Sequence, residues 1–387
     1  MPEVIIIGAG VIGTGIAFHL AKLGCRDVLV LEKNHIGSGS TEKSPGGIRQ
    51  QFSTEINIKL SMESVKFFER FEDETGHPAE FRQHGYLILA TTEEDLGIFH
   101  RNVALQQKLG LGIQLLSPQE VKDIIPELNI DDILGATFCP TDGYADPYSV
   151  VQGFASAARR LGAQIYEDTM VTGLEVSNNR LKGVLTTKGK FEAPTVVNAA
   201  GPHAGIVGRM VGLELPIRPS RRHLFVTEPV FDQPERLNSP HWSKPPMVID
   251  FHNGFWFRRE GACLIFGMRN PDKDEGFSTL VDWKFFADSL AQAASHRLLI
   301  LGDIGIMRGQ AGLHSDTPDS MAILGKTPIE GLYLAGGFSG HGFMHSPAVG
   351  RLMAELILEG KSSQPDFYQL SLDRFQQQDR RQETVFI

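Results

Sequence analysis

The sequence predicts an α/β fold of two interleaved lobes, and three observations lead to this prediction. The chain has 387 residues, more than a single hydrophobic core usually organises. Residues 3–31 have the pattern of a buried strand, a helix and a second strand, which is typical of a parallel sheet. Short strands with alternating apolar residues follow over residues 217–268, and they favour an antiparallel sheet in a second lobe.

The first lobe begins with a strand, a helix and a second strand. Residues 3–7 are mostly β-branched and end at Gly8, as expected of a buried parallel strand. Residues 11–23 repeat their apolar positions with a helical period and stop at Gly24, a residue type that favours helix ends. Residues 27–31 are again apolar, and two parallel strands joined by a helix form a right-handed unit.

The middle of the chain alternates between the two lobes. Residues 55–72 have the pattern of a long amphipathic helix. A change of pattern at Gly85 marks the start of the second lobe, and the buried strand over 195–201 indicates a return to the first. The other expected elements are helices over 93–108, 118–125, 148–161, 281–296 and 346–358, a β-meander over 163–178 and 180–190, and strands over 86–90, 133–138, 217–227, 247–250, 254–257, 263–268, 323–324 and 332–335.

This order of elements predicts two discontinuous domains. The first comprises residues 1–85, 147–215 and 305–387, and the second comprises residues 86–146 and 216–304. The first is expected to be an α/β domain with a parallel sheet. The second is expected to be an α+β domain built on a mostly antiparallel sheet, because its strands alternate and follow one another closely.

Composition and charge exclude several classes of protein. The net charge is −9 and the pI is near 5.8, which argues against nucleic acid or an anionic membrane as a partner. Cys25, Cys139 and Cys263 are far apart, so neither a disulfide framework nor a metal site is expected. We therefore expect a reducing, cytoplasmic compartment. No signal peptide is recognised, and no apolar run reaches the roughly 18 residues of a transmembrane segment.

The turn after the first strand carries Gly8-x-Gly10-x-x-Gly13. In a dinucleotide-binding turn the first glycine permits the tight bend, the second lets the backbone approach the pyrophosphate, and the third lets the helix pack on the strand. The helix N-terminus then offers N–H groups and a partial positive charge to the phosphates. Glu32 closes the second strand, where an acid accepts the ribose hydroxyls. The first domain is therefore expected to be a Rossmann-type domain that binds a dinucleotide.

Two further segments favour FAD over NAD. Residues 37–41, Gly-Ser-Gly-Ser-Thr, follow the second strand and supply hydroxyls and amides close to the pyrophosphate. Residues 336–344, Gly-Gly-Phe-Ser-Gly-His-Gly-Phe-Met, lie near the other end of the chain and lead into a helix. A cofactor gripped at its pyrophosphate by one end of the chain and at its reactive ring by the other is long, as FAD is. We therefore expect a flavoenzyme.

With these motifs the sequence resembles the FAD-dependent amine and amino-acid oxidoreductases of the D-amino-acid-oxidase superfamily, of the glycine and sarcosine oxidase type. The likeness is greatest to the β subunits of dye-linked L-proline dehydrogenase and heterotetrameric sarcosine oxidase, and it runs nearly the full length. The segments that carry it are GSGST at 37–41, GGIRQQF at 46–52, PTDGYADP at 140–147, NAAG at 198–201 and GFSGHGFM at 337–344.

The resemblance implies that FAD lies extended, with its adenine near Glu32 and Val171 and its flavin ring between residues 44–49 and 337–344. Gly312 stands where monomeric sarcosine oxidase has the cysteine that tethers its flavin, so we expect FAD to be bound non-covalently. The residues expected to bind FAD are Gly8, Gly10, Val11, Ile12, Gly13, Glu32, Lys33, Gly39, Ser40, Thr41, Gly46, Gly47, Ile48, Val171, Ala200, Gly201, Gly337, Phe338, Gly340, His341, Gly342, Phe343 and Met344.

Two departures from the sarcosine oxidases favour a dehydrogenase. Met344 stands where they carry a lysine beside the flavin, and Ile265 stands at the place of the lysine that activates oxygen in the monomeric enzyme. Electrons are then expected to pass to an acceptor other than, or besides, O₂. The last helix is expected to start just past Met344 and to aim its positive end at the N1–C2=O edge of the flavin.

Four residues are candidates for the catalytic chemistry. Arg49 is the first choice, because a guanidinium meets a carboxylate with two parallel hydrogen bonds, and the resemblance also allows it to act on the flavin face. His223 and His314 are candidates to accept an amine proton, since imidazole titrates near neutrality. A structural role is an equally good interpretation of each histidine. Arg269 is a weaker candidate for binding the substrate carboxylate.

Three functions follow from this interpretation. The first is a dehydrogenase that oxidises a small secondary or cyclic amino acid, proline- or sarcosine-like, by hydride transfer from Cα or the N-methyl carbon to flavin N5. The second is a self-sufficient glycine- or sarcosine-type oxidase that produces H₂O₂. The third is an FAD-binding assembly protein without turnover. The expected partners are a small amino-acid substrate and an electron acceptor, and a partner subunit or a homo-oligomer is left open.

Overall fold

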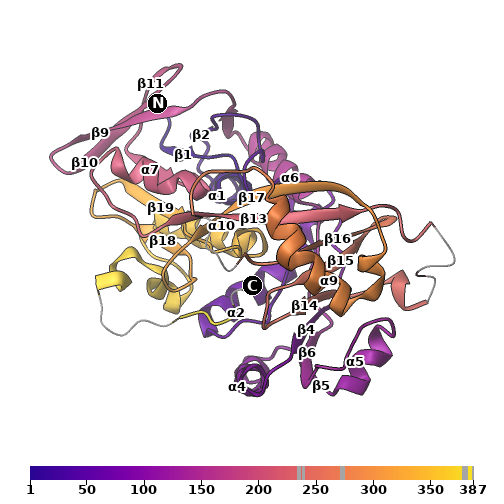
Figure 1. Ribbon diagram of the computed structural model, residues 1–387. Helices are drawn as coiled ribbons and strands as arrows, with labels where there is room; N and C mark the ends of the chain where they lie inside the picture. The colour runs from indigo at the N-terminus through magenta and orange to yellow at the C-terminus, as the bar shows by residue number, and fades with distance from the viewer. Residues whose placement is uncertain (233–236, 238–239, 271–274, 377–381, 386–387) are drawn as a thin grey trace.

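The computed structural model describes residues 1–387 apart from 233–236, 238–239, 271–274, 377–381 and 386–387. Two large sheets with helices packed on them organise the chain (Figure 1). Successive strands pass from one sheet to the other and back, because β1 and β2 belong to the first sheet, β4 to β6 to the second, and β8 and β12 to the first again. The predicted α/β fold with an interleaved, mostly antiparallel second part is confirmed.

The six-stranded sheet contains the predicted dinucleotide-binding unit. Its central strand β1 lies between β12 and β2, and both pairs are parallel. Only β18 runs antiparallel, against β19 at one edge. The strands in spatial order are β18 (Ile323–Lys326), β19 (Leu332–Gly336), β12 (Thr195–Asn198), β1 (Val4–Ile7), β2 (Val28–Leu31) and β8 (Gln164–Tyr166).

The two faces of this sheet are covered differently. Val4 and Ile6 of β1 belong to a core with the helices α1 (Val11–Lys22), α6 (Pro147–Arg160) and α10 (Gly342–Glu359). Ile5 and Ile7 point to the opposite face, because successive residues of a strand alternate. They pack with the antiparallel strands β9 (Val171–Ser177), β10 (Arg180–Thr186) and β11 (Gly189–Glu192) and with α7 (Ala204–Arg209).

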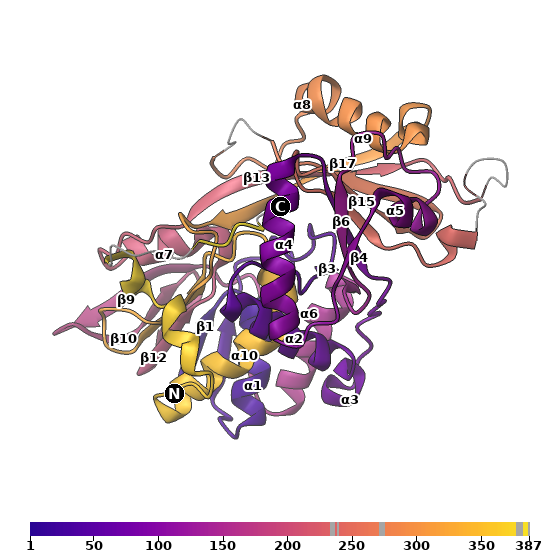
Figure 2. The same cartoon turned by 90° about the horizontal axis from the view of Figure 1, so that it is seen from below.

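The eight-stranded sheet is antiparallel except where β14 pairs with β4. The helical region around α8 (Trp283–Phe285) and α9 (Ala291–Arg297) covers the side away from the six-stranded sheet (Figure 2). The strands in spatial order are β17 (Ile306–Asp316), β13 (Arg218–Thr227), β16 (Cys263–Gly267), β15 (Trp256–Glu260), β14 (Met247–Asp250), β4 (Tyr86–Ala90), β6 (Gly135–Cys139) and β5 (Gln114–Leu116).

The remaining strands and α-helices of the described chain are a short strand pair and four helices. Strands β3 (Gly47–Ile48) and β7 (Gly143–Tyr144) form a short antiparallel pair. The remaining helices are α2 (Glu55–Phe68), α3 (Phe71–Thr75), α4 (Glu93–Lys108) and α5 (Pro118–Ile124). In the part of the chain that the structure describes, no helix combines the length and apolar composition that a bilayer span requires. All three cysteines are free thiols.

Strand β17 was not predicted, although it is the longest strand of the second sheet. It pairs with β13 from Ile306 to Asp316. Residues 305–387 were assigned to the first domain, but this strand places residues 306–316 in the eight-stranded sheet. Gly309 and Gly312 lie inside the strand and interrupt the apolar alternation that signals a strand. Otherwise the division into domains stays a prediction.

The predicted β-meander starts later than expected. Its first strand, β8, pairs in parallel with β2 at the edge of the six-stranded sheet, because α6 returns the chain alongside β2. Only β9, β10 and β11 form the antiparallel sheet.

Two predicted helices are interrupted, since the one over 55–72 divides into α2 and α3. The one over 281–296 contains a π-helical turn between α8 and α9.

Helix α10 begins at Gly342, earlier than the start past Met344 that was predicted. Pro347 lies within the helix, where it cannot donate a backbone hydrogen bond. The hydroxyl of Ser346 donates to the carbonyl oxygen of Phe343 at 2.8 Å and so satisfies an acceptor that Pro347 leaves without its amide. The helix therefore continues through the proline and starts closer to the glycine-rich turn.

Candidate active site

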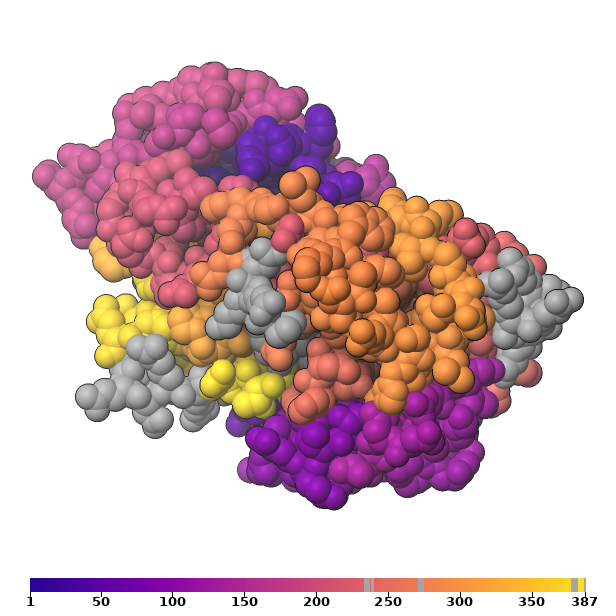
Figure 3. Space-filling model, in the orientation of Figure 1, coloured from indigo at the N-terminus to yellow at the C-terminus, as the bar shows by residue number. Residues whose placement is uncertain are grey.

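A cavity of about 730 Å³ lies between the two sheets. One wall consists of the turn after β1, the loop after β2 and the start of α10, and the opposite wall consists of residues from β13, β14 and β17. The volume is in the range of ligand and cofactor pockets, roughly 300–1,000 Å³. On the face seen in Figure 3, the indigo atoms of the N-terminal part lie recessed between the magenta and orange parts of the chain.

The three glycines of the turn after β1 lie where close approach demands them. Gly8 has φ +106°, and a Cβ there would lie 2.6 Å from the carbonyl oxygen of Ala199. A Cβ on Gly13 would lie 1.9 Å from the carbonyl oxygen of Gly8. Gly10 is the N-cap of α1 with φ −72°, and a Cβ there would lie 3.3 Å from the Thr41 hydroxyl. The turn and the start of α1 therefore approach the cavity and the neighbouring backbone more closely than residues with larger side chains would allow.

The loop after β2 forms hydrogen bonds with both walls of the cavity. The Thr41 hydroxyl accepts a hydrogen bond from the backbone N–H of Val11 at 3.1 Å. The neighbouring hydroxyl of Ser40 donates to the carbonyl oxygen of Leu313 in β17 at 2.6 Å. The loop thus connects the start of α1 with the second sheet.

Glu32 and Lys33 line the same end of the cavity. One carboxylate oxygen of Glu32 accepts from the backbone N–H of Ala9 at 2.9 Å, and the other accepts from that of Asn34 at 2.9 Å. The Lys33 ammonium donates to Nε2 of His203 at 3.1 Å. Burial and the charge of Lys33 lower the pKa of His203 below its ordinary value, so this histidine is a neutral acceptor.

At the other end of the cavity, side chains of the eight-stranded sheet pack on the glycine backbone of the loop after β19 and of β3. Gly340 has φ +87°, and a Cβ there would lie 2.6 Å from Cε1 of His314. A Cβ on Gly47 would lie 2.0 Å from the hydroxyl oxygen of Tyr86. The first residues of α10, Gly342 among them, line the cavity here. A second helix N-terminus therefore opens on it.

The structure brings most of the predicted cofactor residues to this one cavity. Gly13, Gly46, Ile48 and Gly337 do not line it, and all the other predicted cofactor residues do. Three of these four are glycines packed against neighbouring chain: a Cβ on Gly46 would lie 2.0 Å from the carbonyl oxygen of Ala145, and one on Gly337 would lie 2.5 Å from Cγ2 of Thr317. The contact of each lining residue with FAD stays a proposal.

Arg49 follows β3, lines the cavity and is only 3% exposed. Its Nη1 donates to the carbonyl oxygen of Gln51 at 2.7 Å, and its Nη2 donates to that of Val385 at 3.1 Å. The Phe52 ring lies below the guanidinium at 4.3 Å. Burial lowers the pKa of Arg49, but an arginine side chain stays protonated in proteins. No carboxylate of a described residue forms an ion pair with it, so it presents a positive charge oriented by carbonyl groups.

A buried carboxyl group supports the segment that carries Arg49. Asp142 is 0% exposed and accepts from the backbone N–H of Gln50 at 2.9 Å and from Nε2 of Gln51 at 2.9 Å. Oε1 of Gln51 accepts from the Thr137 hydroxyl at 2.6 Å. Burial raises the pKa of Asp142 to about 6. The GGIRQQF and PTDGYADP motifs therefore meet in one polar network behind the cavity.

The two candidate histidines differ in what they can do. Nε2 of His223 accepts from the backbone N–H of Asp282 at 3.1 Å, and its ring packs against Phe285. This nitrogen is therefore occupied in holding the segment before α8. Burial and the charge of Arg222 hold the pKa of His314 well below its ordinary value. His314 is thus neutral at neutral pH, and its Nδ1 lies 3.9 Å from Oδ1 of Asp316. The lowered pKa also makes its imidazole a weaker base.

Two arginines line the wall formed by the eight-stranded sheet. Nη2 of Arg222 donates to Oδ2 of Asp316 at 3.3 Å, and burial lowers the pKa of Arg222. The charge of Arg269 also lowers this pKa, so the two guanidinium groups are neighbours. Arg269 is exposed at the end of β16 and forms no ion pair with a described residue. Arg222 was not predicted, although it stands directly before His223 in the sequence.

Lys43 and Tyr86 also line the cavity and were not predicted. A Cβ on Gly312 would lie 2.8 Å from Cβ of Lys43, so the lysine packs on bare backbone of β17. Burial raises the pKa of the Tyr86 hydroxyl above its ordinary value. Lys43 follows GSGST and could have been included with that motif. Tyr86 opens an apolar strand, and nothing in the local pattern distinguishes it from a core aromatic residue.

Met344 and Ile265 were both expected beside the flavin, and the structure separates them. Met344 lines the cavity, whereas the described wall of the cavity does not include Ile265. Ile265 is buried in β16, between β13 and β15. Its place in the sheet therefore gives no support to an argument about oxygen activation.

The charge of the cavity wall contrasts with that of the whole chain. The protein carries a net charge of −9, yet the described lining residues include several permanent cations and a single carboxylate. Such a wall favours anionic ligands. The cations are Lys33, Lys43, Arg49, Arg222 and Arg269, and the carboxylate is Glu32.

The fold and this site define an FAD-dependent oxidoreductase. The sequence model of the family DAO, FAD dependent oxidoreductase, matches residues 3–356, and the chain belongs to this family. The predicted family membership and enzymatic class are confirmed. The residues present also fit FAD, because two helix N-termini and a row of cations face one long cavity, as an anionic dinucleotide with an electron-accepting ring requires.

Individual relatives lie within the amino-acid oxidoreductases. Human mitochondrial sarcosine dehydrogenase is 31% identical, over 96% of this chain and 41% of that protein. The crystal structure of L-proline dehydrogenase from P. horikoshii is 34% identical with a TM-score of 0.89, covering 98% of this chain and 99% of that one. Glycine oxidase from Geobacillus kaustophilus is 27% identical with a TM-score of 0.83, covering 96% and 98%. The chain spans less than half of the length of its mitochondrial dehydrogenase relatives.

Proposed function

We propose that the chain is an FAD-dependent dehydrogenase of a small secondary or cyclic amino acid, proline- or sarcosine-like, with FAD bound non-covalently. The observation that carries this proposal is the cationic cavity that runs from the Gly8–Gly13 turn to Arg222 and Arg269. One end suits the phosphates of a dinucleotide, and the other offers guanidinium groups to the carboxylate of an amino acid. The likeness to sarcosine and proline dehydrogenases agrees with this substrate class.

The cofactor would be held mainly by backbone. The start of α1 and the Thr41 hydroxyl would face the pyrophosphate, and Glu32 would accept from the ribose. Gly340 and the start of α10 would lie against the flavin. The bound FAD supplies a two-electron acceptor for the hydrogen that leaves Cα or the N-methyl carbon. Gly312 offers no thiol for a covalent tether, and Lys43 packs on its backbone.

Substrate orientation would depend on the arginines of the cavity. Arg269 has no ion-pair partner among the described residues, so its guanidinium can bind the substrate carboxylate with two hydrogen bonds. The guanidinium of Arg222 donates to Asp316 and adds positive charge beside Arg269. Arg49 holds its charge at the opposite wall. The substrate carbon is thereby oriented, and negative charge that develops on the flavin side is stabilised.

His314 would face the substrate amine as the candidate proton acceptor. Burial and the charge of Arg222 lower its pKa, so the imidazole is neutral but is a weak base. The substrate amine would therefore bind in its neutral form and donate a hydrogen bond to a ring nitrogen of His314. His223 would hold the wall in place through Asp282.

A self-sufficient oxidase is the second candidate, and a specific observation favours it. Lys43 places an ammonium group in the cavity wall, and a cation near the flavin can stabilise negative charge formed on O₂. The likeness to glycine oxidase agrees with this alternative. The preference for a dehydrogenase rests on the two dehydrogenase relatives, since Ile265 lies outside the described cavity wall.

Anaerobic flavin reduction tests the proposal. Purified protein loaded with FAD is mixed with L-proline, sarcosine, N,N-dimethylglycine, glycine and D-alanine, and the loss of oxidised flavin absorbance is followed. We expect bleaching by L-proline or sarcosine and slow peroxide formation in air. Rapid stoichiometric peroxide indicates the oxidase instead. Oxidised flavin that persists with every amino acid contradicts both candidates and favours the assembly protein.

The partners and the compartment remain part of this proposal. The natural electron acceptor is proposed to be something other than, or besides, O₂. A partner subunit or a second copy of the chain is compatible with the fold, and a reducing, cytoplasmic location is inferred only from the three free cysteines.

A further inference from the structure

A segment near the end of the sequence is docked on the N-terminus of α2. Glu383 is 1% exposed, and its carboxylate accepts from the backbone N–H groups of Ser53 and Thr54 at 2.8 and 3.2 Å. It also accepts from both of their hydroxyls and from Nδ2 of Asn57, the last at 3.0 Å. Thr54 is the N-cap of α2 but caps no amide with its own side chain. A carboxylate delivered from about 330 residues away therefore caps this helix.

The same segment reaches Arg49. The carbonyl oxygen of Val385 accepts from Nη2 of Arg49 at 3.1 Å, and the backbone N–H of Val385 donates to Glu383 at 3.0 Å. The other end of the guanidinium donates to the carbonyl oxygen of Gln51. One of the two carbonyl groups that orient Arg49 thus belongs to the segment that Glu383 anchors.

The Val385 side chain lies behind the cavity wall. It is buried in a core cluster with Tyr86, Met247 and Ile249, and these three residues also line the cavity. Figure 1 shows the last yellow stretch of the chain beside α2. The segment therefore contacts the cavity wall and Arg49 at the same time.

We propose that residues 383–385 form a positioning element for Arg49, with Glu383 as its anchor. The charge of Glu383 also favours the protonated guanidinium electrostatically. A displaced anchor removes the Val385 carbonyl from Nη2 and leaves the buried guanidinium free to turn away from the cavity. This inference rests on the proposed function of Arg49 at the flavin.

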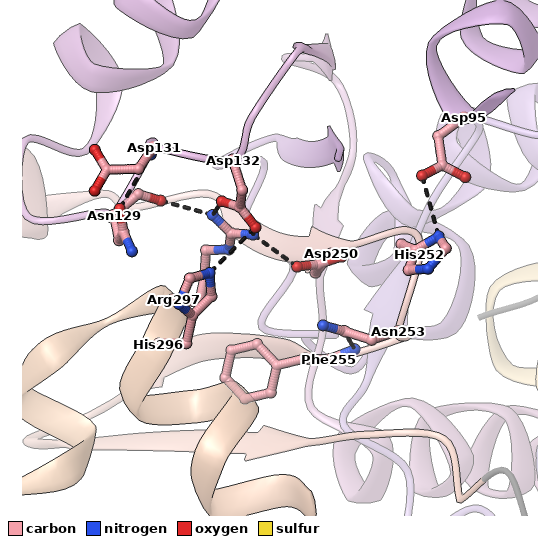
Figure 4. A network of polar contacts seen from close by, with 10 residues as sticks. All are labelled: Asp95, Asn129, Asp131, Asp132, Asp250, His252, Asn253, Phe255, His296 and Arg297. Atoms are coloured by element: carbon pink, nitrogen blue, oxygen red, sulfur yellow. Dashed lines mark hydrogen bonds and ion pairs between the residues drawn. The ribbon is translucent and has the colours of Figure 1, made fainter. Parts of the chain in front are cut away.

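The test compares Glu383→Gln with Asp250→Asn. Asp250 is a matched control because its carboxylate is also buried, at 2% exposure, and pairs at 2.8 Å with Arg297, whose hydrogen bonds and ion pairs to described residues do not include Arg49 or Glu383; Figure 4 shows this pair. FAD content, melting temperature, the midpoint potential of bound FAD and the anaerobic reduction rate with L-proline and sarcosine are measured. Both variants are expected to melt earlier and to retain FAD.

Only Glu383→Gln is expected to shift the midpoint potential to more negative values and to slow the limiting reduction rate at least tenfold, with a smaller change in the substrate Kd. In an Arg49→Met background, Glu383→Gln should add little, because coupled residues are not additive. Ser53→Ala, which removes one donor to Glu383, provides a milder variant if Glu383→Gln does not fold. Its midpoint potential should shift in the same direction and by less.

An unchanged midpoint potential and rate in both Glu383→Gln and Ser53→Ala overturn the inference, and so does full additivity with Arg49→Met. The midpoint potential requires no substrate. A shifted potential in a protein that no amino acid reduces therefore contradicts the proposed function and leaves the positioning role of Glu383 standing.

Discussion

The two ends of the cavity are built in different ways. The end proposed to bind the pyrophosphate consists of contiguous segments beside one sheet, where Gly8, Gly10 and the Thr41 loop lie close together. The end proposed to bind the substrate consists of side chains such as Arg49 and His314, which come from strands and loops far apart in the sequence. The first end therefore depends on the space left open by glycine. The second depends on the charge and orientation of a few side chains.

The largest effect is expected from filling the space at the pyrophosphate end. Gly10 has φ −72°, which any residue adopts, so a substitution there acts through volume alone. Gly10→Leu should give a colourless protein, measured by the flavin absorbance of the purified material. Gly10→Ala is the control and should remain yellow, because its Cβ would lie 3.3 Å from Thr41. A yellow Gly10→Leu protein shows that the pyrophosphate lies elsewhere.

Removing the charge of Arg49 should affect chemistry without removing the cofactor. Arg49→Met is expected to retain FAD and to slow anaerobic flavin reduction about 100-fold, the usual cost of losing one group that stabilises developing charge. Stopped-flow absorbance measures the rate. Arg49→Lys should be intermediate, because it keeps the charge and loses the planar fork. Equal rates in wild type and Arg49→Met remove this residue from the mechanism.

Arg269 tests recognition of the substrate carboxylate. Arg269→Met should raise the Kd of the amino acid about 10- to 100-fold, since a charge-assisted pair contributes about 1.5–3 kcal/mol. The limiting reduction rate should change much less. The control is the corresponding amine without a carboxylate, pyrrolidine for L-proline, whose weak binding should be insensitive to the substitution. If both ligands lose affinity equally, Arg269 does not bind the carboxylate.

A smaller effect is expected from a single hydrogen bond at the pyrophosphate end. Thr41→Val removes the acceptor for the Val11 amide at the start of α1. The loss of about 0.5–1.5 kcal/mol predicts an FAD Kd raised roughly 2- to 12-fold. Fluorescence titration of the apoprotein with FAD measures it. Thr41→Ser keeps the hydroxyl and should bind FAD nearly as tightly as the wild type. If Thr41→Ser loses as much FAD affinity as Thr41→Val, the hydrogen bond is not the cause.

The smallest expected difference between the two ends of the cavity is in how the free energy of unfolding changes with pH. The pKa of His314 is far below its ordinary value, so near pH 6 the unfolded chain binds a proton there that the folded protein does not. Stability therefore falls as the pH drops through about 6.5, by about 1.4 kcal/mol between pH 7.5 and 5.5 for one such group. Urea unfolding at both pH values should show that His314→Gln removes this part of the loss. Thr41→Val should leave this pH dependence unchanged. If His314→Gln loses as much stability between pH 7.5 and 5.5 as the wild type does, His314 is not the group responsible.

Local motifs explain why most of the predicted site residues line one cavity. Glu32 and the glycines of the first turn were recognised because their spacing along one βαβ unit sets their positions in space. Arg49 and His314 were recognised through motifs of the family, and the structure places both at the cavity. Lys43 was missed although it stands shortly after the GSGST motif. Arg222 and Tyr86 were missed because a single basic or aromatic residue in a strand gives no signal of what it faces. For Ile265 the family resemblance suggested a position near the flavin, but the described wall of the cavity does not include this residue.

The amino-acid pattern alone was enough to determine the parallel sheet, the dinucleotide-binding turn and the two-lobed architecture, because these follow from short-range periodicity and glycine chemistry. The strand β17, the early start of α10 and the contact between Val385 and Arg49 depend on pairing between residues up to 336 positions apart. Such pairing is set by the packing of whole sheets and helices. The substrate end of the cavity was therefore decided by the assembled fold, where charges from separate strands come within reach of one another.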